Sequence, residues 1–168
     1  IAAMTGLWGG PYFTEHHGLS LKETGAVLFA LFSATMMAGY IFGRIDRSGT
    51  NRVRVIALSG AVSAVAFLAT ALVPFGPKAA AACLFIAIFA QQFYVPLLAA
   101  LKTIVPPASL GRTTAMFSIL AVGAIPVTQW GYGVILKATG SHAWPLGALS
   151  LLIAAMTAQF VLTFPKTT

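Results

Sequence analysis

Charged residues are scarce in this sequence. Only 8% of its 168 residues are Asp, Glu, Lys or Arg, and the acidic residues number three, whereas soluble domains carry about 25% charged residues. The hydrophobic fraction is 58%, and the mean hydropathy is strongly positive. A single water-soluble core cannot bury this many apolar side chains, so the composition indicates an integral membrane protein whose first partner is the lipid bilayer.

Cysteine is nearly absent, and basic residues are not gathered on any one face. The single Cys83 lies within an apolar stretch, which excludes an intramolecular disulfide and CxxC redox chemistry. The net charge of +7 comes from basic residues scattered between apolar stretches. Because nucleic-acid binding requires a basic patch, we expect no nucleic-acid partner.

Apolar stretches that are long enough to cross a bilayer make up most of the chain. A transmembrane helix needs about 20 consecutive apolar residues. We therefore predict an all-α membrane protein with complete spans at about 24–42, 53–73, 79–101, 113–136 and 143–164. Residues 1–13 are apolar but too short to cross. We expect them to be the second part of a truncated sixth helix, which makes the sequence a fragment.

The polar links between these spans predict an orientation. Successive links lie on alternate sides of the membrane, and the links at 43–54 and 102–112, together with the C-terminal tail, carry seven Lys and Arg residues. The other side carries three, Lys22, Lys78 and Lys137. Since an excess of Lys and Arg marks the cytoplasm, we expect loops 43–54 and 102–112 and the C-terminus to be cytoplasmic.

The most highly charged link also carries a motif. Asp46-Arg47-Ser48-Gly49, followed by Arg52, resembles the loop signature of the major facilitator superfamily (MFS) of transporters, which runs G-x-x-x-D-[RK]-x-G-x-[RK]-[RK]. Phe42 holds the first Gly position, with Gly43 one residue later, and Asn51 replaces the first of the paired basic residues.

Other stretches resemble the same family in the same order. Trp8-Gly-Gly-Pro-Tyr followed by HGLSLKETG is similar to the seventh helix leading into the eighth, and the run from Gly123 to Gly140 is similar to the eleventh helix. The resemblance covers the whole chain. It implies the C-terminal six-helix half of an MFS transporter, an inverted three-plus-three helix repeat, a missing N-terminal half as partner, and a location in a plasma membrane such as the bacterial inner membrane.

The resemblance implies transport of a small solute by alternating access, as a secondary active transporter or a facilitator. It also implies that Asp46, Arg47, Gly49 and Arg52, with Gly43, latch the cytoplasmic ends of neighbouring helices. A carboxylate such as Asp46 is favoured near a helix N-terminus by the helix dipole. The alternative is that the basic residues of this link only follow the positive-inside rule.

Uncharged polar residues within the apolar stretches are the candidates for binding a solute. Apart from Arg54 at the start of the span 53–73, the complete spans contain no charged residue and no histidine. Any acid that carries H⁺ or binds Na⁺ as a coupling ion is therefore expected outside this half. The resemblance implies a binding site near the membrane midplane, where interrupted helices meet. The substrate-binding candidates are Trp8, Tyr12, Gln91, Gln92, Gln129 and Trp130.

Each candidate also has an ordinary structural explanation. A glutamine at membrane depth forms interhelical hydrogen bonds, and Trp and Tyr anchor helices at the interface. Adjacent residues on an α-helix point about 100° apart, so Gln91 and Gln92 are not expected to face one cavity equally. Pro96 is expected to interrupt the same span.

Two local patterns predict helix starts and contacts. The run Ser20 to Glu23, SLKE, is a capping box that starts a helix. Ala residues recur every fourth position, and Gly39 and Gly43 form a GxxxG, which together predict a stripe for close helix packing. The stripe consists of Ala26, Ala30, Ala34 and Ala38.

The residues also bear on other classes of function. Glu15, His16 and His17 lie in a polar stretch that we expect to be a solvated loop, with no metal site and no cofactor. An intramembrane enzyme needs a nucleophile and a base at membrane depth, and the histidines lie outside the spans, so no enzymatic activity is expected. A passive channel and a non-transporting polytopic membrane protein remain alternatives to a transporter.

Overall fold

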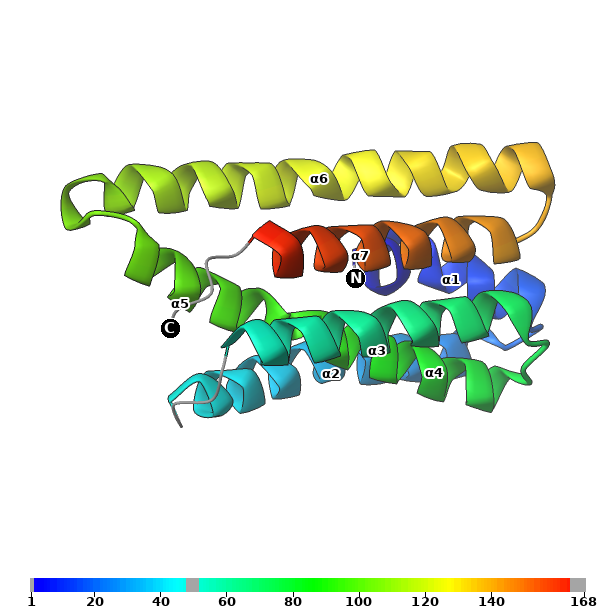
Figure 1. Cartoon of the computed structure of the whole chain (residues 1–168). Coiled ribbons are helices and arrows are strands. Elements are labelled where there is room, and N and C mark those ends of the chain that lie inside the picture. The colour runs from blue at the N-terminus through cyan, green and yellow to red at the C-terminus, as the bar shows by residue number, and fades with distance from the viewer. Residues whose placement is uncertain (1, 48–51, 164–168) are drawn as a thin grey trace.

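The computed structural model describes residues 2–47 and 52–163, apart from the side chains of Asp46, Arg47 and Thr103. The long helices are joined by short links (Figure 1). They are α2 (Leu21–Arg47), α3 (Arg52–Leu72), α4 (Pro77–Ala90), α5 (Tyr94–Ile104), α6 (Leu110–Thr139) and α7 (Ala143–Thr163). The short elements are η1 (Ala3–Leu7), α1 (Gly9–Pro11), η2 (Tyr12–His16), η3 (Gln91–Phe93) and η4 (Pro107–Ser109).

The prediction of an all-α chain with apolar helices of membrane-spanning length is confirmed. Within the described ranges there is no strand, and five helices are long and apolar enough to cross a membrane. They are Leu21–Ile45, Arg52–Leu72, Pro77–Lys102, Pro107–Thr139 and Ala143–Thr163. Large apolar side chains such as Phe29, Ile119 and Leu151 are exposed on their outer faces. Such exposure is costly in water and expected in lipid.

The N-terminal segment, residues 2–17, forms three short helical elements, η1, α1 and η2, where the sequence predicts the second part of a truncated helix. The N–H of Trp8 bonds to the C=O of Ala3 at 2.9 Å, five residues back, and Gly6 has non-helical angles of φ −106° and ψ −110°. Gly9 lies so close to the carbonyl of Met4 that a side chain there would collide with it. The chain then stays helical to His16, so of Glu15, His16 and His17, which were expected in a loop, only His17 lies outside a helix. The segment is therefore a short, irregular helix with one break at Gly6.

The helix ends follow local chemistry. The predicted capping box is confirmed, because Ser20 N–H donates to Glu23 Oε2 at 3.0 Å and Glu23 N–H donates to Ser20 Oγ at 3.3 Å. Pro77 begins α4, where its missing N–H costs nothing. Gly140 ends α6 with φ +65° and donates to Leu136 C=O at 2.8 Å, which is the usual glycine termination of a helix.

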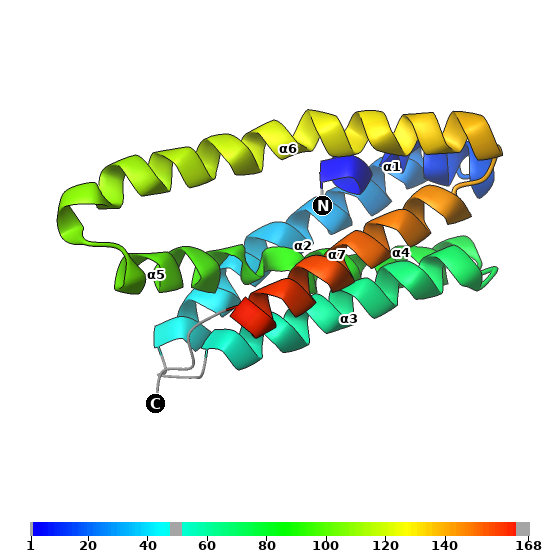
Figure 2. The ribbon, with the colours of Figure 1, turned by 45° about the horizontal axis from the view of Figure 1, so that its top comes forward.

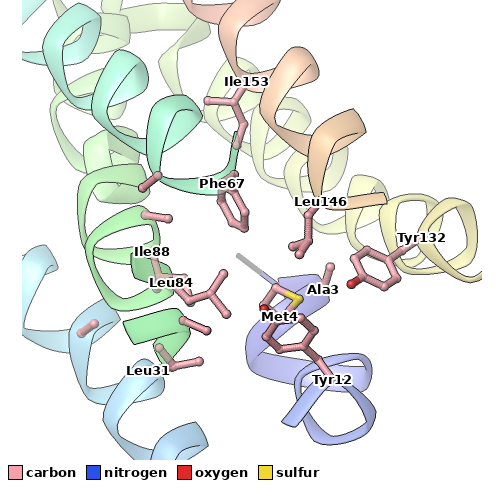
Figure 3. Packing of buried hydrophobic residues seen from close by; sticks show 14 of the residues in the cluster. Ala3, Met4, Tyr12, Leu31, Phe67, Leu84, Ile88, Tyr132, Leu146 and Ile153 are labelled. Atoms are coloured by element: carbon pink, nitrogen blue, oxygen red, sulfur yellow. The ribbon is translucent and has the colours of Figure 1, made fainter. Parts of the chain in front are cut away.

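The closest helix packing is between α3 and α7. A side chain at Gly60 would collide with Thr157, and Ser150 Oγ donates to the C=O of Ala64 at 2.7 Å. Around this pair, the buried side chains form one cluster that also takes in the N-terminal segment (Figure 3). Met4, which is fully buried, is enclosed by this cluster.

The prediction that small residues of α2 form a stripe for close packing is only partly correct. Ala34 and Ala38 are buried, but Ala26 and Ala30 are exposed. The predicted GxxxG contact is wrong for the described residues, because a Cβ added at Gly39 or Gly43 would meet nothing within 4 Å. The buried line instead runs through larger residues such as Leu31 and Phe42.

The links lie at two opposite ends of the bundle (Figures 1 and 2). The turns at 17–20, 73–76 and 140–142 lie at one end, called here the α6–α7 end. The α5–α6 link lies at the other, the α2–α3 end, where α2 ends and α3 begins. Helix α6 lies at the edge of the bundle, and Tyr132, near the α6–α7 end, is the one buried residue among those described in this helix.

Candidate functional site

One apolar helix is broken halfway along its length. Helix α4 ends at Ala90, a 3₁₀ turn follows at Gln91–Phe93, and α5 restarts at Tyr94. Pro96 explains this break, because it has no N–H to donate to the C=O of Gln92 in an α-helix. The proline is fully buried. In a membrane, irregular backbone of this kind is tolerated only where it is buried in protein or lines a cavity.

The break borders a groove of about 570 Å³, called here the central groove. Its polar lining comes from the N-terminal segment, α2, the broken helix and α6. These residues are Thr5, Thr35, Gln91, Gln92, Tyr94 and Thr128. The rest of the lining is apolar: Ala2, Phe32, Phe93, Leu97, Ala121, Ala124 and Ile125. Amide and hydroxyl groups thus face an otherwise apolar hollow, with no charged side chain among the lining residues.

Helix α6 contributes a second irregularity to the central groove. Pro126 lies inside this helix, so the C=O of Val122 receives no hydrogen bond from that position. Thr128, two residues later, donates its hydroxyl to the C=O of Ile125 at 2.9 Å. The groove is therefore lined on two sides by helices whose hydrogen-bond ladder is incomplete.

The six sequence candidates fall in different places. Gln91 and Gln92 both line the central groove, although neighbouring side chains on a helix point in different directions, and both lie on the 3₁₀ turn between two α-helices. Trp130 points outward and is 73% exposed. Tyr12 is buried near the α6–α7 end, away from the central groove.

Trp8 and Gln129 hold the N-terminal segment against α6. The indole N–H of Trp8 donates to the C=O of Gln129 at 2.8 Å, and the amide of Gln129 donates to the C=O of Ala2 at 3.2 Å. Trp8 also stacks on Tyr132, with ring centroids 5.4 Å apart, and lies against Gly133. Neither side chain lines the central groove.

Sequence reasoning missed most of the hydroxyl groups in the groove. Thr5, Thr35 and Thr128 carry no distinguishing signal, because threonine is common in membrane helices, where it bonds to its own backbone. Tyr94, which stacks on Phe117 at 5.5 Å, was detectable from its position next to the two glutamines and before Pro96.

A second cluster of polar side chains lies at the α6–α7 end. The ring of Tyr12 lies 5.5, 4.9 and 5.3 Å from those of His16, His17 and His142, centroid to centroid. The rings of His16 and His142 are 5.7 Å apart. Tyr132 Oη and His142 Nδ1 share a hydrogen bond of 2.9 Å. We call His16, His17 and His142 the histidine cluster.

The histidine cluster is partly buried, which differs from the solvated loop expected from the sequence. His142 is only 7% exposed, and the Nε2 of His17 is buried with no hydrogen-bond partner among the described residues, so this region is not simply a solvated loop. Burial lowers the pKa of His142, and the charges of His16 and His17 lower it further. Burial and then His16 lower the pKa of His17 in the same way. Among the described residues, no group of side chains is arranged to hold a metal ion.

The charged link lies partly outside the described residues. Asp46 and Arg47 belong to the end of α2, but their side chains lie outside the described residues, as does Gly49. Arg52 begins α3, and Gly43 lies within α2. Nearby, Arg44 donates to Tyr40 Oη at 3.1 Å on the same helix.

Comparison of the chain with protein-family models, with curated proteins and with solved structures finds no match.

Proposed function

We propose that this chain forms part of a carrier that moves a small solute across a membrane by alternating access. The observation that supports this most is the broken helix at Gln91–Phe93, which lines the central groove midway along an apolar helix. Discontinuous helices at the bilayer midplane are typical of the solute sites of transporters. A helix that serves only as an anchor has no need of this break.

The chemistry of the groove favours an uncharged solute, or an uncharged part of one. Its polar groups are amides and hydroxyls, which donate and accept hydrogen bonds but carry no charge. This half therefore fits an uncharged part of a solute, and any countercharge or coupling ion, H⁺ or Na⁺, is assigned to the partner half. Resemblance to the MFS supports the same mechanism through the Asp46-Arg47-x-Gly49 link, which in our proposal faces the cytoplasm of a plasma membrane.

Uptake measurements test the proposal. The chain is expressed in cells together with its partner half, and uptake of a panel of uncharged small solutes is measured. Saturable uptake is expected, whereas single-channel currents would indicate a pore.

The role of the groove has its own test. Gln92→Ala removes a hydrogen-bonding group worth about 0.5–1.5 kcal/mol, so the half-saturation concentration should rise by roughly 2–12-fold. Trp130→Ala is the control, because this side chain is exposed on the surface of the bundle and does not line the groove; it should transport as the wild type does. Equal transport by both variants would contradict the assignment of the groove.

A further inference from the structure

The histidine cluster joins distant parts of the chain. It contains every histidine of the sequence. His16 and His17 end the N-terminal segment, whereas His142 lies in the turn between α6 and α7. A pocket of about 190 Å³ lies between His16 and His142, and it is lined also by Thr70–Pro74, at the end of α3 and in the turn after it. The two parts of the chain therefore meet at this end through imidazole rings.

The other groups that titrate or carry charge near the cluster do not neutralise it. Tyr12 of the N-terminal segment and Tyr132 of α6 contact the rings, and the Cys83 thiol of α4 lies near Tyr12. Phenols and thiols ordinarily stay neutral below about pH 8. The residues of α3 and α7 that line the pocket have no titratable side chain. Glu15, Lys22, Lys78 and Lys137, at the same end, have exposed side chains.

Protonation works against the contact between the two parts of the chain. A charge on His17 or His142 would be partly buried without a carboxylate partner among the described groups that contact it, which is unfavourable. A second charge would lie within about 6 Å of the first, as the ring distances show. Both effects are relieved when the N-terminal segment moves away from the α6–α7 turn.

The same contact leads to the central groove. His142 bonds to Tyr132, Tyr132 stacks on Trp8, and Trp8 bonds to the backbone of Gln129. The side chain of Gln129 bonds to Ala2, which lines the groove. A movement of the N-terminal segment would therefore change one wall of the groove.

We propose that the histidine cluster is a proton-binding site that controls a clamp between the N-terminal segment and the α6–α7 turn. The clamp is closed when the rings are neutral and opens when protons bind. This property belongs to the conformation of the chain and does not depend on the identity of a transported solute.

The direction of the pH effect follows from the lowered pKa values. When a histidine has a lower pKa in the closed form than its ordinary value of 6.5, the open form binds protons more tightly. The closed form therefore has its full stability above pH 6.5, and it loses stability as the pH falls below this value.

Distance measurements between spin labels test the proposal. Labels are attached to Leu7→Cys in the N-terminal segment and Lys137→Cys at the end of α6, both exposed, in a Cys83→Ala background. The full chain in lipid nanodiscs is brought from about pH 7.5 to about pH 5, the range in which histidine titrates. The label distance should increase in one step with its midpoint below pH 6.5. A constant distance in the wild-type cluster would overturn the proposal.

Two controls locate the effect. Labels at Leu68→Cys and Leu152→Cys, on the packed α3–α7 pair, should keep their distance over the same range. Replacing all three histidines by Asn, which keeps hydrogen-bonding groups but does not titrate, should abolish the step; a step that persists would overturn the proposal. If this variant fails to fold, NMR titration of the wild-type histidines decides instead. The titration of His142 should coincide with the distance step, and separate midpoints would contradict the clamp.

Discussion

A substitution at Gly133 tests how α6 packs against Trp8 of the N-terminal segment. A Cβ at this position would lie 2.6 Å from Trp8 Cζ2, whereas ordinary contacts begin at 3.4 Å, so the indole would have to move by 3.4 − 2.6 = 0.8 Å. The indole is held by its stacking on Tyr132 and by its hydrogen bond to Gln129. Losing one of them costs about 0.5–1.5 kcal/mol, and losing both costs about 1–3 kcal/mol. Alanine in place of glycine returns about 0.5–1 kcal/mol of helix propensity.

Gly133→Ala should therefore destabilise the fold by about 1 kcal/mol, which lowers the melting temperature by roughly 2–4 °C for a chain of this size. Thermal unfolding in detergent, followed by far-UV circular dichroism, measures the change. Gly131→Ala is the matched control on the same helix, since its Cβ would meet nothing within 4 Å. In a Trp8→Ala background, Gly133→Ala should no longer destabilise. Equal melting temperatures for the two glycine variants would refute the reasoning.

Three further changes test other parts of the account. Gly60→Ala should destabilise by about 1–3 kcal/mol because its Cβ collides with Thr157, whereas Gly39→Ala, with open space around it, should not destabilise; similar melting temperatures would contradict the α3–α7 packing. Ser150→Ala removes the hydrogen bond to Ala64 and should lower the free energy of unfolding by about 1 kcal/mol in the same melting assay. Ser33→Ala, whose hydroxyl bonds only within its own helix, is the control and should leave it unchanged. Asp46→Asn should slow uptake without altering the amount of protein inserted in the membrane, and normal uptake would remove the latch hypothesis.

The helices and several of their ends could be predicted because they depend on local chemistry. Apolar content predicts the five long helices, and Pro77 and the Ser20–Glu23 box start helices where they occur in the sequence. The break near Gln91 was predictable for the same reason, since Pro96 removes a backbone donor wherever the helix lies. These features require no knowledge of what packs against them.

The contacts between helices could not be predicted in this way. In a membrane, lipid and neighbouring helices are equally apolar, so hydrophobicity does not distinguish a buried face from a lipid-facing one. Ala26 and Ala34 look alike in the sequence, yet one is exposed and the other buried. The irregular N-terminal segment depends on Trp8 reaching Gln129, and the histidine cluster depends on His16 meeting His142; both contacts join residues more than a hundred positions apart.

The most direct test of alternating access is the labelling of Gln92→Cys from each side of the membrane. In a Cys83→Ala background, a membrane-impermeant maleimide is applied to cells and, separately, to inverted vesicles, with and without a solute found by the uptake screen. Trp130→Cys, at an exposed position outside the central groove, is the control, and its labelling rate should not change when solute is added. We predict that saturating solute raises the labelling rate of Gln92→Cys from one side and lowers it from the other. Rates that rise or fall together on both sides, or no reaction from either side, would contradict a carrier built around the central groove.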